Sequence, residues 1–186
     1  MRARKIGLIG SAGLGKSSVA ADVSARSGLV FLKSKDITRP ILDKYGYDYA
    51  RCECVEKFLS RKEIEFEIVC DRIMAEEVAG EFITDRTTLE CFAYALLNVE
   101  KYEDEEIRRL EEMCRGNLSN YTELFYFSYR NGWLEENGVR TMSGYFQWKM
   151  DMLIRGLIND WGLKNVMAVE GDPVAQIMKV IGAGSD

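Results

Sequence analysis

The sequence predicts a doubly wound α/β fold, in which helices cover both faces of a mainly parallel, five-stranded sheet. Two observations predict it. Five short apolar segments alternate along the chain with stretches of helical period, the pattern of βαβ units. A glycine-rich turn also joins the first of these segments to the first helix, as in sheets that bind phosphates. The strands are expected at residues 5–9, 29–32, 81–84, 124–127 and 166–169.

Composition limits the classes of protein to which this chain can belong. Its 186 residues predict a single domain, and 47% hydrophobic with 30% charged residues are typical of a globular protein. The net charge of −5 gives no overall signature of nucleic-acid or anionic-membrane binding, although a local basic cleft stays open. Histidine is absent, which excludes imidazole bases and Ser-His-Asp hydrolysis. Acid–base chemistry must therefore use carboxylates.

Cysteine usage and the N-terminus predict a cytoplasmic location. The apolar run behind the basic N-terminus is too short for a signal peptide, and no window reaches the ~18 apolar residues of a membrane span. We expect no membrane partner, and a dimer is compatible with the sequence. The five cysteines form no C-x-x-C pair and are interpreted as reduced thiols: Cys52, Cys54, Cys70, Cys91 and Cys114.

The glycine-rich turn at residues 10–17 matches the phosphate-binding pattern G-x-x-x-x-G-K-[ST] without deviation. Successive N–H groups of such a turn converge on phosphate, and the following helix adds a favourable dipole. Lys16 is expected to bridge the β- and γ-phosphates of ATP, and Ser17 to hold Mg²⁺. A glycine-rich turn that binds nothing is the alternative. The predicted nucleotide-binding residues here are Gly10, Ser11, Ala12, Gly13, Leu14, Gly15, Lys16, Ser17 and Ser18.

The second predicted strand is followed by Lys33-Ser34-Lys35-Asp36, which places Asp36 close to its carboxyl end. If this strand lies near the first, the Asp36 carboxylate lies beside the phosphate turn, where a general base would be needed to accept a proton. Residues 37–78 are predicted to be mostly helical, with Pro40 in the first turn of a short helix. This region is interpreted either as a helical pair that covers the sheet or as an acceptor pocket. In the pocket, tyrosines would stack on a planar ring and arginines would contact phosphate: Arg39, Arg51, Arg61 and Arg72.

The third predicted strand places Asp85 and Arg86 at its carboxyl end. Asp85 is expected to hold Mg²⁺, and Arg86 to neutralise charge on a transferred phosphoryl group. The alternative is an aspartate that caps a helix at 87–98, and both roles can coexist. The charge-dense segment 99–115 is interpreted as a solvent-exposed helix to which no catalytic or binding role is assigned.

After the fourth strand, residues 130–142 predict a lid-like segment that closes over ATP. This segment carries Arg130 and Arg140 and has turn residues at both ends, so a plain surface loop is the alternative. A helix is expected at 143–161 and another at 174–181, with Pro173 at its first position.

The chain resembles a small P-loop kinase-like group, which includes the ribosylnicotinamide kinase domain and many phage-encoded predicted nucleoside or nucleotide kinases. The resemblance covers most of the chain. It is carried by residues 10–17, by Phe82-Ile83-Thr84-Asp85-Arg86 followed by Cys91-Phe92-Ala93-Tyr94-Ala95, and by Asn137-Gly138-Val139-Arg140 before the helix at 146–157.

This resemblance implies transfer of the ATP γ-phosphoryl group to a nucleoside-like acceptor. Asp36 matches the carboxylate that accepts the hydroxyl proton, with Asp85 as the other candidate base. Asp85-Arg86 resembles the Asp-Arg or Glu-Arg element of thymidylate and deoxynucleoside kinases, and Arg140 resembles the lid arginine. Asp172 and Pro173 lie where such kinases pack adenine.

Three functions are open on this basis. The leading one is a Mg²⁺-ATP-dependent kinase with a free nucleoside or nucleotide as acceptor, in which Lys16, Asp36, Arg86 and Arg140 are catalytic. A kinase acting on hydroxymethyluracil within phage DNA is the second, with nucleic acid as partner and the host cytoplasm as location. An ATPase or switch with water as the acceptor is the third.

Overall fold

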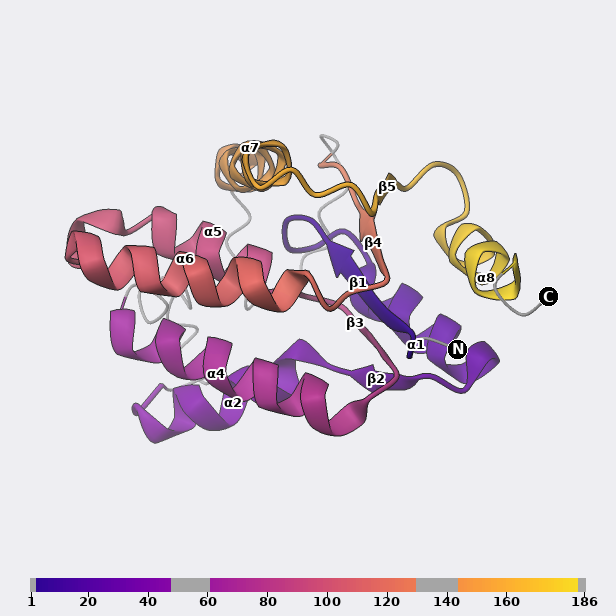
Figure 1. Ribbon diagram of the computed structural model, residues 1–186, viewed down its shortest axis with the longest axis horizontal. Helices are drawn as coiled ribbons and strands as arrows, with labels where there is room; N and C mark the ends of the chain where they lie inside the picture. Colours follow the sequence, from indigo (N-terminus) through magenta and orange to yellow (C-terminus); the bar gives the residue numbers. More distant parts are fainter. Residues whose placement is uncertain (1–2, 48–60, 130–143, 184–186) are drawn as a thin grey trace.

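The five predicted strands form one sheet in the order β2-β3-β1-β4-β5, and every described pairing is parallel. This computed structural model describes residues 3–47, 61–129 and 144–183 (Figure 1). In register, Ile6 of β1 pairs with Ile83 of β3 on one side and with Glu123 of β4 on the other. The predicted fold class is confirmed. The strands are β1 Lys5–Ile9, β2 Val30–Leu32, β3 Phe82–Thr84, β4 Glu123–Tyr126 and β5 Val166–Ala168.

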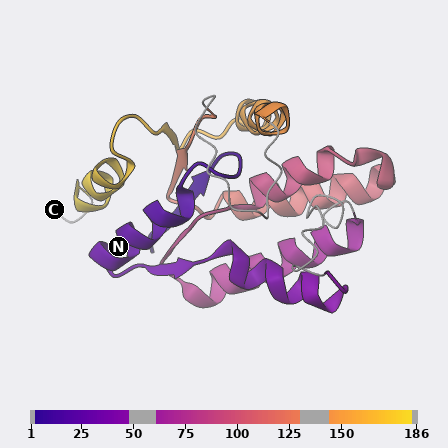
Figure 2. The same cartoon turned by 180° about the vertical axis from the view of Figure 1, so that it is seen from behind.

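Helices cover both faces of this sheet (Figures 1 and 2). One face carries α1 packed against α8, and the other carries a layer in which α5 contacts α4, α6 and α7 while α2 contacts α4. In the described part of the chain, no helix combines the length and the apolar character needed to cross a membrane. The helices are α1 Lys16–Ser27, α2 Ser34–Lys44, α4 Lys62–Ala79, α5 Thr88–Leu96, α6 Asp104–Leu118, α7 Gly144–Asp160 and α8 Pro173–Ala183, with a short 3-10 helix η2 at Val99–Lys101.

Two hydrophobic clusters form the core, one on each face, because alternate strand residues point to opposite sides. Ile6, Leu8 and Phe125 belong to the cluster beneath α1 and α8. Phe82 and Leu124 belong to the larger cluster beneath the other helices. Burial on both faces explains why the strands are continuous apolar runs in the sequence.

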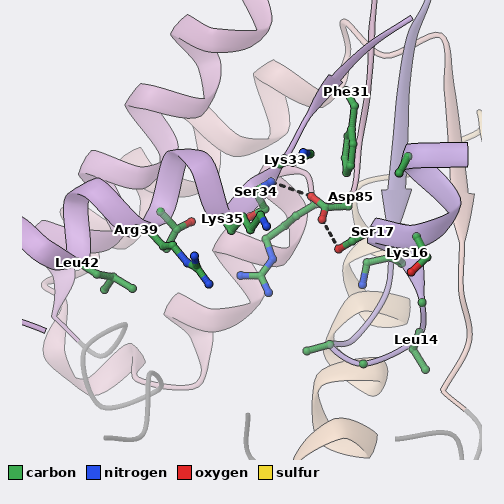
Figure 3. Close-up of a pocket in the computed structure, with 17 residues that line it drawn as sticks. Leu14, Lys16, Ser17, Phe31, Lys33, Ser34, Lys35, Arg39, Leu42 and Asp85 are labelled. Atoms are coloured by element: carbon green, nitrogen blue, oxygen red, sulfur yellow. Dashed lines mark hydrogen bonds between the residues drawn. The ribbon is translucent and has the colours of Figure 1, made fainter. Parts of the chain in front are cut away.

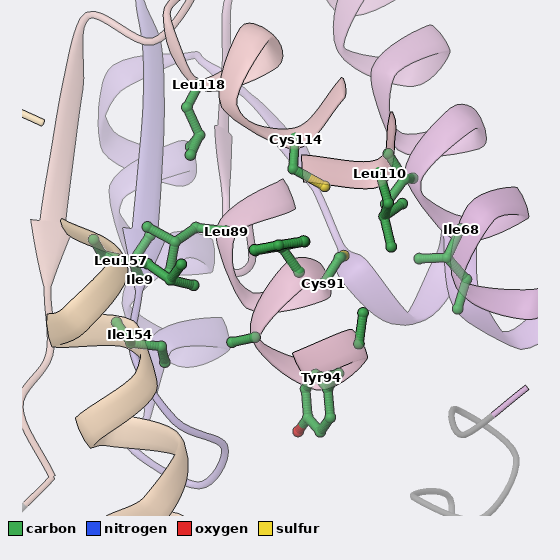
Figure 4. Packing of buried hydrophobic residues seen from close by; sticks show 14 of the residues in the cluster. Ile9, Ile68, Leu89, Cys91, Tyr94, Leu110, Cys114, Leu118, Ile154 and Leu157 are labelled. Carbon is green, nitrogen blue, oxygen red and sulfur yellow. The ribbon is translucent and has the colours of Figure 1, made fainter. Parts of the chain in front are cut away.

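Helix α5 is the centre of the larger cluster (Figure 4). Its Leu89, Cys91 and Tyr94 are surrounded by side chains of α4, α6 and α7, among them Cys114 and Ile154. Burial raises the pKa of the Cys91 thiol to about 12, so it stays protonated and packs as a small apolar group. The described cysteines carry free thiols, as the sequence predicts: Cys70, Cys91 and Cys114.

Two local expectations are wrong, and the condition under which Asp36 would lie beside the phosphate turn is not met. Pro40 lies well inside α2, because that helix begins at Ser34 rather than just before the proline. Residues 99–115 do not form one helix. The short helix η2 ends at Lys101, and α6 begins at Asp104, where Glu103 and Glu106 form a capping box. The second strand does not lie beside the first, because β3 is inserted between β2 and β1.

Gly7 lies in the middle of β1, where three side chains leave no room for a Cβ atom. A Cβ built on Gly7 would lie 2.6 Å from Thr87 Cγ2, 2.7 Å from Leu124 Cδ2 and 2.8 Å from Tyr121 Cε1. Glycine at this position therefore lets the start of α5 pack closely on the central strand.

We predict that Gly7→Ala destabilises the protein by about 1–3 kcal/mol, because the added methyl group overpacks the core. Urea unfolding measures the change. Gly116→Ala is the matched control, because a Cβ at Gly116 in α6 meets nothing within 4 Å. This control is expected to be neutral or to stabilise by up to about 1 kcal/mol. Equal stability of Gly7→Ala and the wild-type chain would contradict the packing argument.

Candidate active site

The phosphate-binding turn connects β1 to α1, and its backbone depends on glycine. Gly13 has φ 85° and Gly15 has φ 76°, both in the left-handed region, and Gly15 is the N-cap of α1. Gly10 has φ 143°, and a Cβ there would lie 2.4 Å from the carbonyl oxygen of Phe127. The predicted motif thus forms a turn that a chain without these glycines could not make.

Lys16 is held inside the turn. Its side chain is only 7% exposed, and its Nζ donates to the carbonyl oxygens of Gly10 at 2.5 Å and Ser11 at 2.7 Å. The ammonium group thereby lies inside the concavity that the turn encloses. A buried charge-assisted network of this kind fixes the position of the cation before any phosphate arrives.

Asp85 joins three elements at the carboxyl edge of the sheet. It follows β3, its Oδ2 accepts a hydrogen bond from the Ser17 hydroxyl, and its Oδ1 accepts one from the Ser34 N–H at 2.8 Å. The adjacent oxygens of Ser17 and Asp85 are hard ligands of the kind that Mg²⁺ prefers. These two residues therefore fit a magnesium site that the phosphates of a bound nucleotide would complete.

A cavity of about 650 Å³ opens over this pair (Figure 3). The phosphate turn lines one part of it, and β2 with the first turns of α2 lines another. Leu14 and Lys16 lie on one side of Asp85, and Arg39 and Leu42 lie on the other. The residues of the turn and α1 in its wall are Ala12, Gly13, Leu14, Gly15, Lys16, Ser17, Ser18 and Ala21, and the others are Phe31, Lys33, Ser34, Lys35, Thr38, Arg39, Leu42, Asp85 and Arg86.

Arg86 and Arg72 have different roles. Arg86 lines the cavity, with its guanidinium 5.1 Å from the centre of the Tyr94 ring. Arg72 is fully buried behind the site, where it donates to the Arg86 carbonyl at 2.7 Å, to Thr84 Oγ1 at 3.2 Å and to Ser34 Oγ at 2.9 Å. Arg72 therefore fastens α2 and α4 to the end of β3, and the prediction that it contacts phosphate is wrong.

Glu90 connects the phosphate turn to the segment after β3. One carboxylate oxygen accepts the Gly10 N–H at 3.2 Å, and the other accepts the Thr87 N–H at 2.9 Å and the Thr87 hydroxyl at 2.8 Å. Thr87 is the N-cap of α5 and forms a capping box with Glu90. Thr87, rather than an aspartate, thus caps this helix.

Glu65 of α4 is a buried carboxylate behind the cavity. It is 1% exposed, and its Oε1 has no hydrogen-bond partner among the described residues. Burial raises the pKa of Glu65 to about 8, although the positive charges of Arg86 and Arg72 act in the opposite direction. Glu65 therefore carries a proton at neutral pH.

A smaller hollow of about 90 Å³ lies on the other side of the phosphate turn. Leu14, Val19, Phe127 and Pro173 are among its lining residues. Asp172 does not line it; its Oδ1 accepts the N–H groups of Val174 and Ala175 and so begins α8. Pro173 is the first residue of that helix, as predicted.

The predicted base is not at the expected position. Asp36 lies in the first turn of α2 rather than at a strand end, it is exposed, and it does not line the described cavity. The order of the strands explains this, because β2 lies at the edge of the sheet. The catalytic role of Asp36 stays a prediction.

Other expected site residues lie outside the described part of the chain. These include Arg140 with the whole lid-like segment 130–142, Arg130, and Arg51 within the acceptor region. Two tyrosines of that region are described, and neither lines the cavity. Tyr47 is buried in the core, and Tyr45 contacts Arg61, Lys44 and Glu67.

Sequence reasoning missed Glu90 and Glu65, and it did not predict the structural role of Arg72. Each looks like an ordinary charged residue of a helix, but each is 2% exposed or less. For Glu90 a signal existed, because a threonine followed three residues later by glutamate is a capping box. For Arg72 and Glu65, only their place among apolar residues at helical spacing could have indicated burial.

Comparison with known families gives one family assignment. A family model described as AAA domain matches residues 5–174. No curated protein matches the sequence.

Several solved structures share the fold. NadR in complex with NR has a TM-score of 0.65 and 14% identity over 92% of this chain, which spans only 44% of the length of that NadR chain. Deoxyadenosine kinase from M. mycoides with bound dCTP has a TM-score of 0.69 and 14% identity, covering 96% of this chain and 99% of that one. Thymidylate kinase from Candida albicans has a TM-score of 0.64 and 18% identity, covering 98% and 92%. At such identities the likeness shows the fold, and the expected resemblance to P-loop kinases is confirmed at that level.

We predict that Glu90→Ala lowers the free energy of unfolding by about 2–4 kcal/mol, because it leaves the buried N–H groups of Gly10 and Thr87 without an acceptor. Urea unfolding measures the loss, and ATP binding by calorimetry is expected to weaken with it. Glu90→Gln keeps a carbonyl acceptor, so it should lower the free energy of unfolding by less than Glu90→Ala does. The exposed Glu77 of α4 provides the control: Glu77→Ala is expected to change stability by less than about 0.5 kcal/mol.

A second prediction concerns the pH dependence of stability. In the folded protein, Glu65 holds its proton up to about pH 8, whereas in the unfolded chain it releases it near its ordinary pKa of about 4.3. Between these values the folded state binds more protons, so stability falls as pH rises. Glu65→Gln removes this dependence and is expected to be more stable than the wild-type chain by roughly 3–5 kcal/mol at pH 8, with the difference shrinking to about 1 kcal/mol at pH 5.

Urea unfolding at pH 5, 7 and 8 tests this expectation. Glu63→Gln, an exposed position in the same helical turn, is the control and should show no such trend. A difference between Glu65→Gln and the wild-type chain that is independent of pH would contradict the protonation argument.

Proposed function

This chain belongs to the AAA domain family, and on that premise we propose that it is a Mg²⁺-ATP-dependent phosphotransferase that acts on a nucleoside- or nucleotide-type acceptor. One observation carries the proposal. The phosphate turn, the Ser17–Asp85 pair and Arg86 line the same cavity, and α2 continues its wall beyond them. Such a cavity can hold a donor phosphate and an acceptor side by side, which phosphoryl transfer requires.

The donor half of the mechanism uses the turn and its lysine. The N–H groups of residues 12–17 bind the β- and γ-phosphates, and the dipole of α1 favours their charge. Lys16 Nζ exchanges the carbonyl oxygens of Gly10 and Ser11 for phosphate oxygens. Ser17 and Asp85 would hold Mg²⁺, which would supply positive charge to neutralise the phosphates. The adenine lies toward the hollow beside Leu14 and Pro173.

The transfer half uses Arg86. Arg86 lines the cavity together with Asp85, and in the proposed mechanism its positive charge stabilises the phosphoryl group as it moves. Arg72 positions it by binding the Arg86 carbonyl, and the Tyr94 ring supports its cationic head. This part of the proposal does not depend on Asp36, whose exposed carboxylate is outside the cavity wall.

We predict that Lys16→Ala and Asp85→Asn each reduce phosphoryl transfer by at least 100-fold. The first removes a cation from the transferred group, and the second removes the charged metal ligand. The measurement is transfer from ATP labelled at the γ-phosphate to a panel of nucleosides, nucleotides and DNA containing hydroxymethyluracil. For Asp85→Asn, part of the loss should be recovered at high Mg²⁺ concentration. Lys179→Ala, an exposed lysine on α8, is the control and should keep full activity.

The same panel separates the competing functions. Label recovered only as inorganic phosphate, with every acceptor offered, would support an ATPase and contradict the proposal. Label confined to the modified DNA would support a DNA kinase. Label in a free nucleoside or nucleotide supports the proposed function.

A further inference from the structure

Helix α7 carries large apolar side chains on the side that faces solvent. Tyr145 is 87% exposed, Trp148 is 53% exposed and Met152 is 48% exposed. Their spacing of three and four residues places them on one face of the helix, which we call the outer stripe. In the described part of the chain, the exposed large apolar residues outside α7 are valines and one methionine, on β2, α4 and η2. Exposed aromatic surface is thus concentrated on α7.

The fold of a single chain does not require the outer stripe. The opposite side of α7 is already apolar, and its Met150, Ile154 and Leu157 are buried in the larger cluster, where α7 contacts α5. One apolar face is enough to attach a helix to its domain. Figures 1 and 2 show α7 at the rim of its helical layer. Since aromatic residues and methionine are enriched in protein interfaces, the outer stripe is suited to contact another protein.

Gly156 extends the same face one turn beyond Met152. It is exposed, and a Cβ built on it would meet nothing within 4 Å among the described residues. Glycine inside a helix lowers the stability of that helix relative to alanine, and packing within the described part of the chain gives no reason for it here. Because no Cβ stands in the way, a large side chain from another molecule can lie flat on the helix at Gly156.

Arg155 is fixed along one edge of this face. Its Nε pairs with Asp151 Oδ2 at 3.0 Å, and its Nη2 donates to Met152 Sδ at 3.1 Å. These two contacts hold the guanidinium beside the outer stripe. A guanidinium fixed in this way offers a planar cation, and tryptophan is the aromatic side chain that binds such a cation best.

We propose that a second copy of this chain binds here, with the two α7 helices antiparallel about a two-fold axis at Met152. In such an interface, residues at equal distances before and after Met152 meet across the axis. Trp148 therefore lies on Gly156 of the second copy. Trp148 and Arg155 share one edge of the helix, so the Trp148 ring also reaches the guanidinium of the second copy. Lys149 lies about 120° around the helix from Arg155, which keeps these like charges apart.

The area and the charge of this face fit a second copy. Full burial of an aromatic side chain removes about 150–250 Å² from water, so Tyr145 and Trp148 offer about 200–350 Å² per copy. With Met152 and the flanking side chains, two copies would bury on the order of 1,000 Å², which is the lower limit for a specific interface. The exposed charges of α7 are Lys149, Arg155 and Asp160. Two basic residues are fewer than a nucleic acid or an anionic membrane requires.

Sedimentation velocity at about 1–500 µM protein tests the inference, which does not depend on the proposed function. The wild-type chain is expected to change from monomer to dimer with a dissociation constant on the order of 10 µM. Trp148→Glu is expected to weaken the dimer at least 10-fold, because it removes the central aromatic contact. Met74→Glu, at an exposed position of α4, is the matched control and should change the constant by less than about twofold. Monomers at every concentration, or equal effects of the two variants, overturn the inference.

Gly156→Leu separates specific packing from general adhesion of apolar surfaces. Leucine adds apolar surface, so a non-specific association would become stronger, but it also fills the space that Trp148 of the second copy needs. We expect Gly156→Leu to weaken the dimer at least 10-fold and Gly116→Leu, at an exposed position of α6, to leave it unchanged. Urea unfolding verifies that both variants fold. A stronger dimer with Gly156→Leu overturns the proposed geometry.

Single cysteines test the antiparallel direction, in a chain whose Cys52, Cys54 and Cys70 are replaced by serine. Met152→Cys is expected to form a disulfide-linked dimer with oxidised glutathione, because the two-fold axis brings the two thiols face to face. Tyr145→Cys is expected to stay unlinked, since its two copies would lie about 21 Å apart along the helices. Linkage at both positions means parallel helices and linkage at neither means no contact through α7, and each result overturns the inference.

Discussion

The candidate site depends on the carboxylate of Glu90, which accepts the N–H of Gly10 and both the N–H and the hydroxyl of Thr87. These three hydrogen bonds join the start of the phosphate turn to the start of α5. Since Asp85 and Arg86 lie between β3 and that helix, the donor-binding turn and the residues that would hold metal and stabilise charge keep one relative position. A buried carboxylate satisfied by three donors is a rigid connection, because breaking any bond leaves a polar group unpaired in the core.

Arg72 forms the corresponding connection on the acceptor side. It reaches from α4 to Thr84, to the Arg86 carbonyl and to Ser34, while Asp85 accepts the Ser34 N–H. The first turn of α2 is thereby fixed to the end of β3. Because Lys35 and Arg39 follow Ser34 on that helix, this buried arginine helps to set the position of their backbone relative to Asp85.

The donor side could be predicted from the sequence because its residues are adjacent in the chain to recognisable strands. Residues 10–17 follow β1, and Asp85-Arg86 follows β3, so an apolar run was enough to place them. The position of Asp36 could not be predicted, since it depends on strand order and on where α2 begins, and both are set by long-range packing. Glu90 and Glu65 were missed, and Arg72 was assigned a contact with phosphate, for a related reason: the burial of all three depends on neighbouring helices.

The whole chain has a negative net charge, whereas the cavity wall carries mainly positive side chains, and this difference has a physical consequence. With a net charge of −5, the protein repels anions at long range, yet the cations at the carboxyl edge of the sheet create a local positive field. Salt screens distant charges within about 8–10 Å, so a phosphate near the cavity senses mainly the lysines and arginines of its wall. The negative net charge therefore describes the outer surface, where acidic residues of α6 such as Glu105 and Glu112 pair with Arg108. The anion preference of the site is decided instead by which side chains the fold brings around Asp85.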